Sequence, residues 1–209
     1  MFRFEKDMIP VLKVSMADTF NTNYFVEEFS SGLGIADLVF AKKIIKRNSV
    51  LQDFEAMYYL SEYFNKKMSK IVVEDFIELN SLKKNKAYQA INFLKLNNFL
   101  KDHKDGSFCF KGSFKPSVNE FYSIEAKLKD WRQGLYQALR YKNYSHKTFL
   151  AISAEFIHRV DKSLLLENNV GLISVNVEAA RIIIQPRSMT PINQTAFYHL
   201  SENFVTQVA

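Results

Sequence analysis

The stretch from Tyr122 to Leu128 reads YSIEAKL and decides how the rest of the chain is interpreted. Its aromatic and β-branched residues predict a β-strand. Side chains two positions apart lie on the same face of a strand, so Glu125 and Lys127 are predicted to share a face. A carboxylate beside an ammonium group on a strand is the starting point for a charged site.

A second carboxylate comes from an earlier pair of strands. Residues 24–29 and 35–40 are strand-like, and the turn Ser31-Gly32-Leu33-Gly34 between them predicts a hairpin. Asp37 lies in its second strand. If that strand neighbours Tyr122–Leu128, Asp37 and Glu125 come close enough to share a divalent cation, and Mg²⁺ prefers such oxygen ligands. A lysine beside them can orient a water molecule, which suits metal-assisted phosphodiester hydrolysis.

The remaining pattern predicts an α/β protein. Helical spacing of apolar residues indicates helices over residues 4–20, 131–142, 156–166 and 192–205. Further strands are predicted over residues 148–153, 170–177 and 180–185.

A helical block interrupts this α/β pattern. Residues 51–112 hold three predicted helices, with Ser69 as the N-cap of the second, and then a hairpin turn at Asp105-Gly106. This order resembles a winged helix-turn-helix. With the block removed, the remaining elements form one continuous α/β pattern, and surface loops tolerate domain insertions. We therefore expect one domain from residues 1–48 and 117–209, with residues 49–116 inserted in it.

The residues Asp37 and Glu125-Ala126-Lys127, followed by Gln137 and Tyr141 on the next helix, resemble the PD-(D/E)XK nuclease family. The resemblance implies a restriction-endonuclease-like core with a central mixed sheet. It also implies a metal-dependent DNA endonuclease, with a role in restriction, transposition or defence against mobile elements. The implied catalytic residues are Asp37, Glu125, Lys127 and Gln137. The implied ligands of Mg²⁺ or Mn²⁺ are Asp37, Glu125 and Ala126, the last through its carbonyl.

Other acids are candidates for the same site. Glu27 and Glu28 lie on the first hairpin strand, and either could face the metal. Glu5 and Asp7 in the first helix are less favoured by the pattern.

Basic residues are concentrated in the inserted block. The chain carries a formal charge of +6, and residues 80–116 alone hold eight lysines against two aspartates. A basic stripe favours nucleic acid as the partner. Phosphate contacts are predicted for the lysines, and base contacts for the two amides. The predicted DNA-binding residues of the block are Lys83, Lys84, Asn85, Lys86, Gln89, Lys101 and Lys104. A second group, which includes Arg132 and Arg140, flanks the predicted cleft.

Composition excludes several other classes of protein. The single Cys109 excludes a disulfide framework and a cysteine-based zinc site. No apolar run approaches the ~20 residues of a membrane span, and the N-terminus does not resemble a signal peptide. We expect a cytoplasmic protein that binds DNA and makes no membrane contact. Cleavage of both strands would require a homodimer or a partner subunit.

Each candidate also has a purely structural interpretation. Asp37 could pair with Lys42 or Lys43, and Glu125 with Lys127 could form the solvated face of an edge strand. The lysines of the block could form a solvated helix face. These alternatives describe a non-catalytic DNA-binding regulator, or an assembly factor that binds other proteins.

Overall fold

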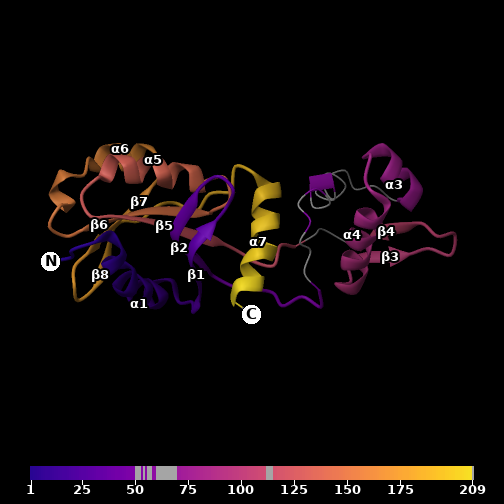
Figure 1. Cartoon of the computed structure of the whole chain (residues 1–209), viewed down its shortest axis with the longest axis horizontal. Helices are drawn as coiled ribbons and strands as arrows, with labels where there is room; N and C mark the ends of the chain where they lie inside the picture. The colour runs from indigo at the N-terminus through magenta and orange to yellow at the C-terminus, as the bar shows by residue number, and fades with distance from the viewer. Residues whose placement is uncertain (50–52, 54, 56–57, 60–69, 112–114, 209) are drawn as a thin grey trace.

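The computed structural model describes residues 1–49, 53, 55, 58–59, 70–111 and 115–208 (Figure 1). Its largest element is a six-stranded sheet with the strand order β1-β2-β5-β6-β7-β8. β5, β6 and β7 are parallel, and the other neighbours are antiparallel, so the predicted α/β class with a central mixed sheet is confirmed. The strands are β1 (Tyr24–Ser30), β2 (Ile35–Ala41), β5 (Phe121–Lys127), β6 (Lys147–Ser153), β7 (Gly171–Val175) and β8 (Ala180–Ile184).

The pairing of β2 with β5 joins two parts of the chain that are distant in sequence. The two strands run antiparallel, with Leu38 opposite Ile124 and Ala41 opposite Phe121. This confirms the predicted contact between the hairpin and the strand that carries Glu125. The ladder ends at the pair Leu38–Ile124, so Asp37 and Glu125 lie just beyond it, where the strands separate.

Helices cover both faces of the sheet (Figure 1). Leu12 and Met16 pack on one face against Phe40 and Ile124. The opposite face is covered in part by helices that bury Leu150. A C-terminal helix packs beside the hairpin (Figure 1). The first face is covered by η1 (Glu5–Met8) and α1 (Ile9–Phe20), the second by α5 (Trp131–Tyr141), η2 (Ile157–Arg159) and α6 (Lys162–Glu167), and the C-terminal helix is α7 (Gln194–Val208).

The hairpin β1–β2 is irregular beside Asp37. Val26 and Phe29 are three positions apart, yet both pack into the cluster under α7, so the alternation of faces changes between them. Glu28 lies in this interval with a left-handed φ of 49°. A residue other than glycine in this conformation costs roughly 1–3 kcal/mol, and such strain gathers at functional sites.

Residues 70–111 form a smaller unit with a core of its own. Phe76, Ile91 and Leu94 pack together with Leu100 and Phe108. Two helices are followed by an antiparallel hairpin, and Ile71 adds one bridge to that hairpin. The elements are α3 (Val73–Leu79), α4 (Lys84–Leu96), β3 (Leu100–Asp102) and β4 (Phe108–Phe110).

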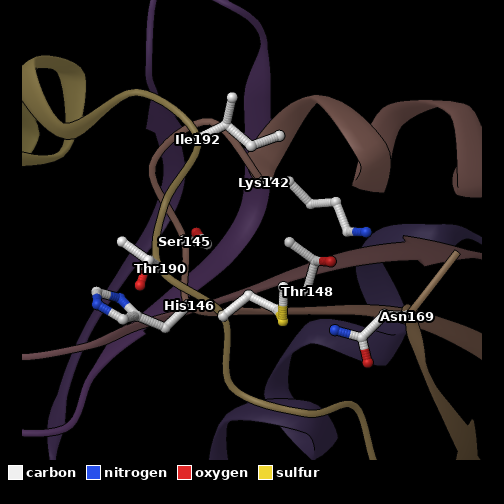
Figure 2. A pocket seen from close by; sticks show the side chains of 8 residues that line it. Lys142, Ser145, His146, Thr148, Asn169, Thr190 and Ile192 are labelled. Atoms are coloured by element: carbon white, nitrogen blue, oxygen red, sulfur yellow. The ribbon is translucent and has the colours of Figure 1, made fainter.

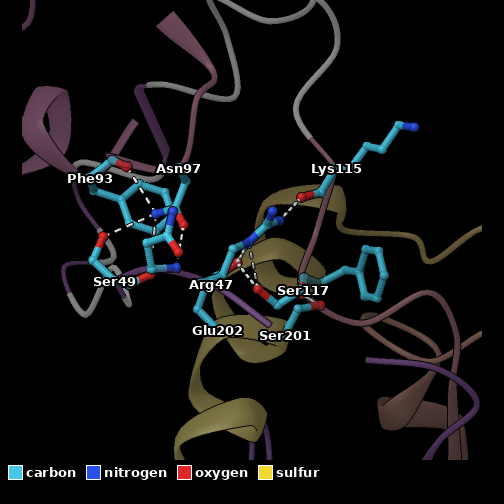
Figure 3. A network of polar contacts seen from close by, with 10 residues as sticks. Arg47, Ser49, Phe93, Asn97, Lys115, Ser117, Ser201 and Glu202 are labelled. Atoms are coloured by element: carbon cyan, nitrogen blue, oxygen red, sulfur yellow. Dashed lines mark hydrogen bonds and ion pairs between the residues drawn. The ribbon is translucent and has the colours of Figure 1, made fainter. Parts of the chain in front are cut away.

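A polar network lies where the chain passes between the sheet and this unit (Figure 3). The Arg47 guanidinium donates to Ser117 Oγ (3.0 Å), lies 3.8 Å from a carboxylate oxygen of Glu202, and stacks over the Phe99 ring. Glu202 is fully buried, and burial raises the pKa of its carboxyl group. The side chain of Asn97 accepts from the Asn48 amide at 2.9 Å. These contacts tie α7, the passing chain and α4 to one another.

One predicted helix is wrong, and part of another lies outside the described residues. The single helix expected over residues 156–166 is wrong, because Val160 is extended and Asp161 accepts bonds from the amides of Ser163 and Leu164 as the N-cap of α6. The predicted N-cap Ser69 and most of the helix expected from Leu51 lie outside the described residues. α3 begins at Val73, after Val72 as its N-cap.

Candidate functional site

Asp37, Ala126 and Lys127 meet where β2 and β5 separate. Asp37 Oδ2 accepts a hydrogen bond from the Ala126 amide at 2.7 Å. Lys127 Nζ lies 2.8 Å from Glu125 Oε1, which confirms that Glu125 and Lys127 share a face of β5. Their side chains are only 2% and 11% exposed respectively. The interpretation of this pair as a solvated edge-strand face is therefore wrong, since β5 is a central strand with buried residues throughout.

Helix α5 completes this charged cluster. Asp130 accepts from the Gln133 amide at 3.1 Å and starts the helix directly after β5. Gly134 allows close packing, because a Cβ there would lie 2.5 Å from Leu150 Cδ1 and 2.9 Å from Lys127 Cγ. One turn beyond Gln137, the buried Tyr141 donates its hydroxyl to Glu125 Oε2, and it also lies 2.6 Å from the carbonyl oxygen of Ile35.

Burial and like charges perturb both carboxyl groups. The pKa of Asp37 is raised by burial first, and by the charges of Glu5 and Glu28. The pKa of Glu125 is raised by burial and by Asp37, although Lys127 and Tyr141 oppose the shift. For Lys127, burial lowers the pKa, but hydrogen bonding and charge from Glu125 raise it above the usual value overall. Two carboxyl groups that disfavour ionisation in one place are typical of functional sites.

Glu5 belongs to the same cluster, although the sequence pattern did not favour it. Its Oε2 lies 3.5 Å from Lys127 Nζ, and its Oε1 accepts from the Leu128 amide at 3.3 Å. Periodicity could place Glu5 near the start of a helix, but no signal in the sequence indicated that this helix approaches the end of β5. A pocket of about 350 Å³ opens beside Glu5 and Asp37, and it is lined by Glu5, Lys6, Ile9, Pro10, Glu27, Glu28, Asp37 and Ala126.

The two further acids predicted on β1 differ in their surroundings. Glu27 forms an ion pair with Lys13 of α1 at 2.6 Å. Glu28 has the left-handed backbone described above, and its charge contributes to the raised pKa of Asp37. Of the two, Glu28 is therefore the one that is electrostatically coupled to the site. Both line the pocket.

Gln137 lies one helical turn before Tyr141 on α5. Its Oε1 is buried and has no hydrogen-bond partner within the part of the chain that the structure describes. An unpaired buried acceptor is costly, and an ordered water molecule would satisfy it.

The basic residues predicted to bind DNA lie on two parts of the molecule. Those on and around α4 are in the smaller unit, and Arg132 and Arg140 are exposed residues of α5. Lys86 forms ion pairs with Asp53 (3.1 Å) and Glu55 (2.8 Å), so its charge is partly offset. The exposed residues of the predicted set in the smaller unit are Lys83, Lys84, Asn85, Gln89, Lys101 and Lys104.

A second pocket, of about 120 Å³, lies at the other end of the sheet, where β6 begins (Figure 2). Lys142, His146 and Asn169 line it together with Thr148, whose buried hydroxyl has no hydrogen-bond partner among the described residues. None of the catalytic, metal-binding or DNA-binding residues named above lies in this pocket.

Two features are absent from the residues that the structure describes, the charged cluster included. Over the described ranges, no group of three or more histidine, cysteine, aspartate or glutamate side chains is arranged to hold a metal ion. In the same residues, no helix has the length and apolar character required to cross a membrane.

Comparison with known proteins identifies no family. No protein-family model and no curated protein matches the sequence. Among solved structures, a protein of unknown function from Silicibacter pomeroyi is 18% identical, with a TM-score of 0.30. The match covers 42% of this chain and 57% of that protein.

Proposed function

We propose that the protein is a metal-dependent DNA endonuclease that hydrolyses phosphodiester bonds. The observation that carries the proposal is the meeting of Asp37 with the Glu125-Ala126-Lys127 segment, through the pairing of β2 with β5. Oxygen ligands from Asp37, Glu125 and the Ala126 carbonyl suit Mg²⁺ or Mn²⁺. The raised pKa values of Asp37 and Glu125 fit the same ion, because a divalent cation offsets the repulsion between these two groups.

In this proposal the ion and the side chains have different roles in the hydrolysis. When bound, the ion would make a water molecule more acidic and offset the charge that builds on the scissile phosphate. Lys127, held by Glu125 and Glu5, orients the attacking water and stays protonated because its pKa is raised. Gln137 positions the substrate from α5. Tyr141 holds the carboxylate of Glu125 in place.

The smaller unit supplies DNA binding in this proposal. We interpret residues 49–116 as an inserted winged helix, with the core of residues 1–48 and 117–209 as the restriction-endonuclease-like domain. Two helices followed by a hairpin, and exposed lysines at the start of α4, support that assignment. Lys83 and Lys84 would contact phosphate, and Asn85 and Gln89 base edges. Cleavage of both strands would require a homodimer or partner subunit.

One observation favours a second candidate function, a DNA-binding regulator without catalysis. Both carboxylate oxygens of Glu125 already have partners, one in Lys127 and one in Tyr141. A carboxylate whose two oxygens are both paired within the protein can serve to stabilise the fold without binding a metal ion. Asp37 differs, because it lines an open pocket and accepts from the Ala126 amide through Oδ2.

The test is cleavage of plasmid DNA with Mg²⁺ or Mn²⁺, with EDTA as the control. The Asp37→Asn variant keeps the shape of the side chain and should abolish cleavage, while DNA binding stays near that of the wild type. Glu27→Gln is the matched control, because Glu27 pairs with Lys13, and it should cut normally. Cleavage by Asp37→Asn at the wild-type rate would show that the active site lies elsewhere. If wild type neither binds metal nor nicks DNA, the regulator is the better description.

A further inference from the structure

The outward face of α5 carries an open groove of about 530 Å³. Tyr136 lies in it with 79% of its surface exposed, more than any other aromatic residue among those described. Exposed aromatic rings at such a level need an explanation, because burial of the ring would be favourable. The groove is lined by Arg132, Gln133, Tyr136, Gln137 and Arg140.

Two arginines flank the ring, four positions before and four after it. Residues at this spacing are neighbours on a helix surface, so Arg132, Tyr136 and Arg140 form one stripe. α5 contains no acidic residue. Arg132 stacks on Trp131 at 4.7 Å, and it lies in electrostatic reach of Asp161 without an ion pair. Arg140 lies against the β1–β2 turn, with its Cζ 3.5 Å from the position of a Cβ on Gly34.

From this arrangement we infer that the groove binds single-stranded DNA, with a base stacked on Tyr136 and phosphates held by Arg132 and Arg140. The inference rests on the proposed function and names the class of nucleic acid that the protein binds. Base faces are hidden inside a duplex, so an exposed ring flanked by cations recognises unpaired bases. The two arginines are separated by about 12 Å along the helix axis. This span corresponds to three or four stacked nucleotides at about 3.4 Å each.

The groove and the charged cluster lie on opposite sides of α5. Gln137 also lines the groove, although its Oε1 is buried below the groove surface. Tyr141, one turn further along α5, contacts Glu125. A strand bound along Arg132, Tyr136 and Arg140 therefore lies on the outer side of α5, and Glu125 is buried on the inner side of the same helix.

The experiment measures binding apart from cleavage. The full-length Asp37→Asn protein, in EDTA, is titrated with a fluorescein-labelled oligo(dT) of about 12 nucleotides, and anisotropy gives the affinity. Trp131 is the single tryptophan of the chain and stacks with Arg132, so a change in its fluorescence would be a second sign of binding at Arg132. Tyr136→Ala should weaken binding by about tenfold or more. Tyr136→Phe keeps the ring and should bind as before. Tyr24 is an exposed tyrosine on β1, so Tyr24→Ala is the matched control.

The outcomes separate this inference from the proposed function. Loss of oligo(dT) affinity in Tyr136→Ala, with duplex affinity and the Tyr24→Ala control unchanged, supports the groove. Equal affinities in Tyr136→Ala and its parent would overturn it, and Asp37-dependent cleavage could still stand. Tighter binding of the matching RNA would overturn the choice of DNA as the ligand. Conversely, Tyr136-dependent binding without cleavage by the wild type supports the groove and refutes the nuclease.

Discussion

Removing one oxygen atom, in Tyr141→Phe, tests whether the charged cluster is held together as the structure describes. The ring is fully buried, and its hydroxyl is shared between Glu125 Oε2 and the Ile35 carbonyl. Phenylalanine fills the same space, so packing is retained and only the hydrogen bonds are lost. Glu125 is then left with Lys127 as its charged partner.

The cost follows from the charge on the acceptor. Hydrogen bonds to charged groups contribute about 1.5–3 kcal/mol to the free energy of unfolding, against about 0.5–1.5 kcal/mol for neutral pairs. For a chain of this size, a loss of 1.5–3 kcal/mol corresponds to a decrease in Tm of about 3–12 °C. Tyr144→Phe is the matched control. Tyr144 is equally buried, but its hydroxyl accepts from the neutral Ser123 at 3.3 Å, so its loss should cost less.

The cost should also depend on pH. The folded pKa of Glu125 is raised by burial and by Asp37, and the bond from Tyr141 lowers it. Loss of that bond raises the folded pKa further, so the variant is most destabilised at neutral pH, where Glu125 must be ionised. As pH falls through the folded pKa, the carboxyl group takes up a proton and the difference from the wild type shrinks.

Urea unfolding of the wild type and both variants, near neutral pH and near pH 4, measures these differences. Tyr141→Phe should lose more stability than Tyr144→Phe near neutral pH and approach it in acid. Equal losses at both pH values, or a larger loss in Tyr144→Phe, would refute the assignment of the charged hydrogen bond.

Two further predictions concern stability. Gly134→Ala should lower the free energy of unfolding by about 1–3 kcal/mol, because the new Cβ would lie 2.5 Å from Leu150 Cδ1. Gln133→Ala, at an exposed position of the same helix, is the control. Equal melting temperatures of these two variants would contradict the packing of α5. Asp37→Asn should stabilise the fold by about 0.5–2 kcal/mol near neutral pH, since its raised pKa makes the ionised form unfavourable there, and the gain should vanish as acid protonates the wild-type carboxyl group. Calorimetry against Glu27→Gln measures the effect, and a destabilised Asp37→Asn would count against it.

Local patterns predicted the parts of the site that depend on strand geometry. The two-residue spacing of Glu125 and Lys127, and the hairpin carrying Asp37, were sufficient because side-chain alternation is a property of any strand. Glu5 was not favoured, since its role depends on where η1 approaches β5. The ion pairs of Lys86 with Asp53 and Glu55 join residues far apart in sequence, and no local pattern indicates such a contact.

The sequence patterns also did not predict the unusual backbone conformation of β1. The left-handed Glu28 interrupts β1 at a residue type that does not favour that conformation, so composition gave no sign of it. Likewise, the helical spacing of apolar residues over 156–166 favoured one helix, although the side chain of Asp161 caps the N-terminus of a separate helix, α6.

The chain leaves the six-stranded sheet and returns to it at a single point. Ile44 bridges Val118, the Lys43 carbonyl accepts from Asn119 at 3.0 Å, and the Ile45 amide donates to Ser117 at 2.7 Å. The sheet therefore holds both ends of the intervening segment together, whatever that segment contains. Because doubling the length of a loop adds only about 0.6 kcal/mol of closure entropy, the size of the segment hardly affects the sheet. The segment between Ile45 and Ser117 can therefore be exchanged for one of another length, with the strands that carry the charged cluster left intact.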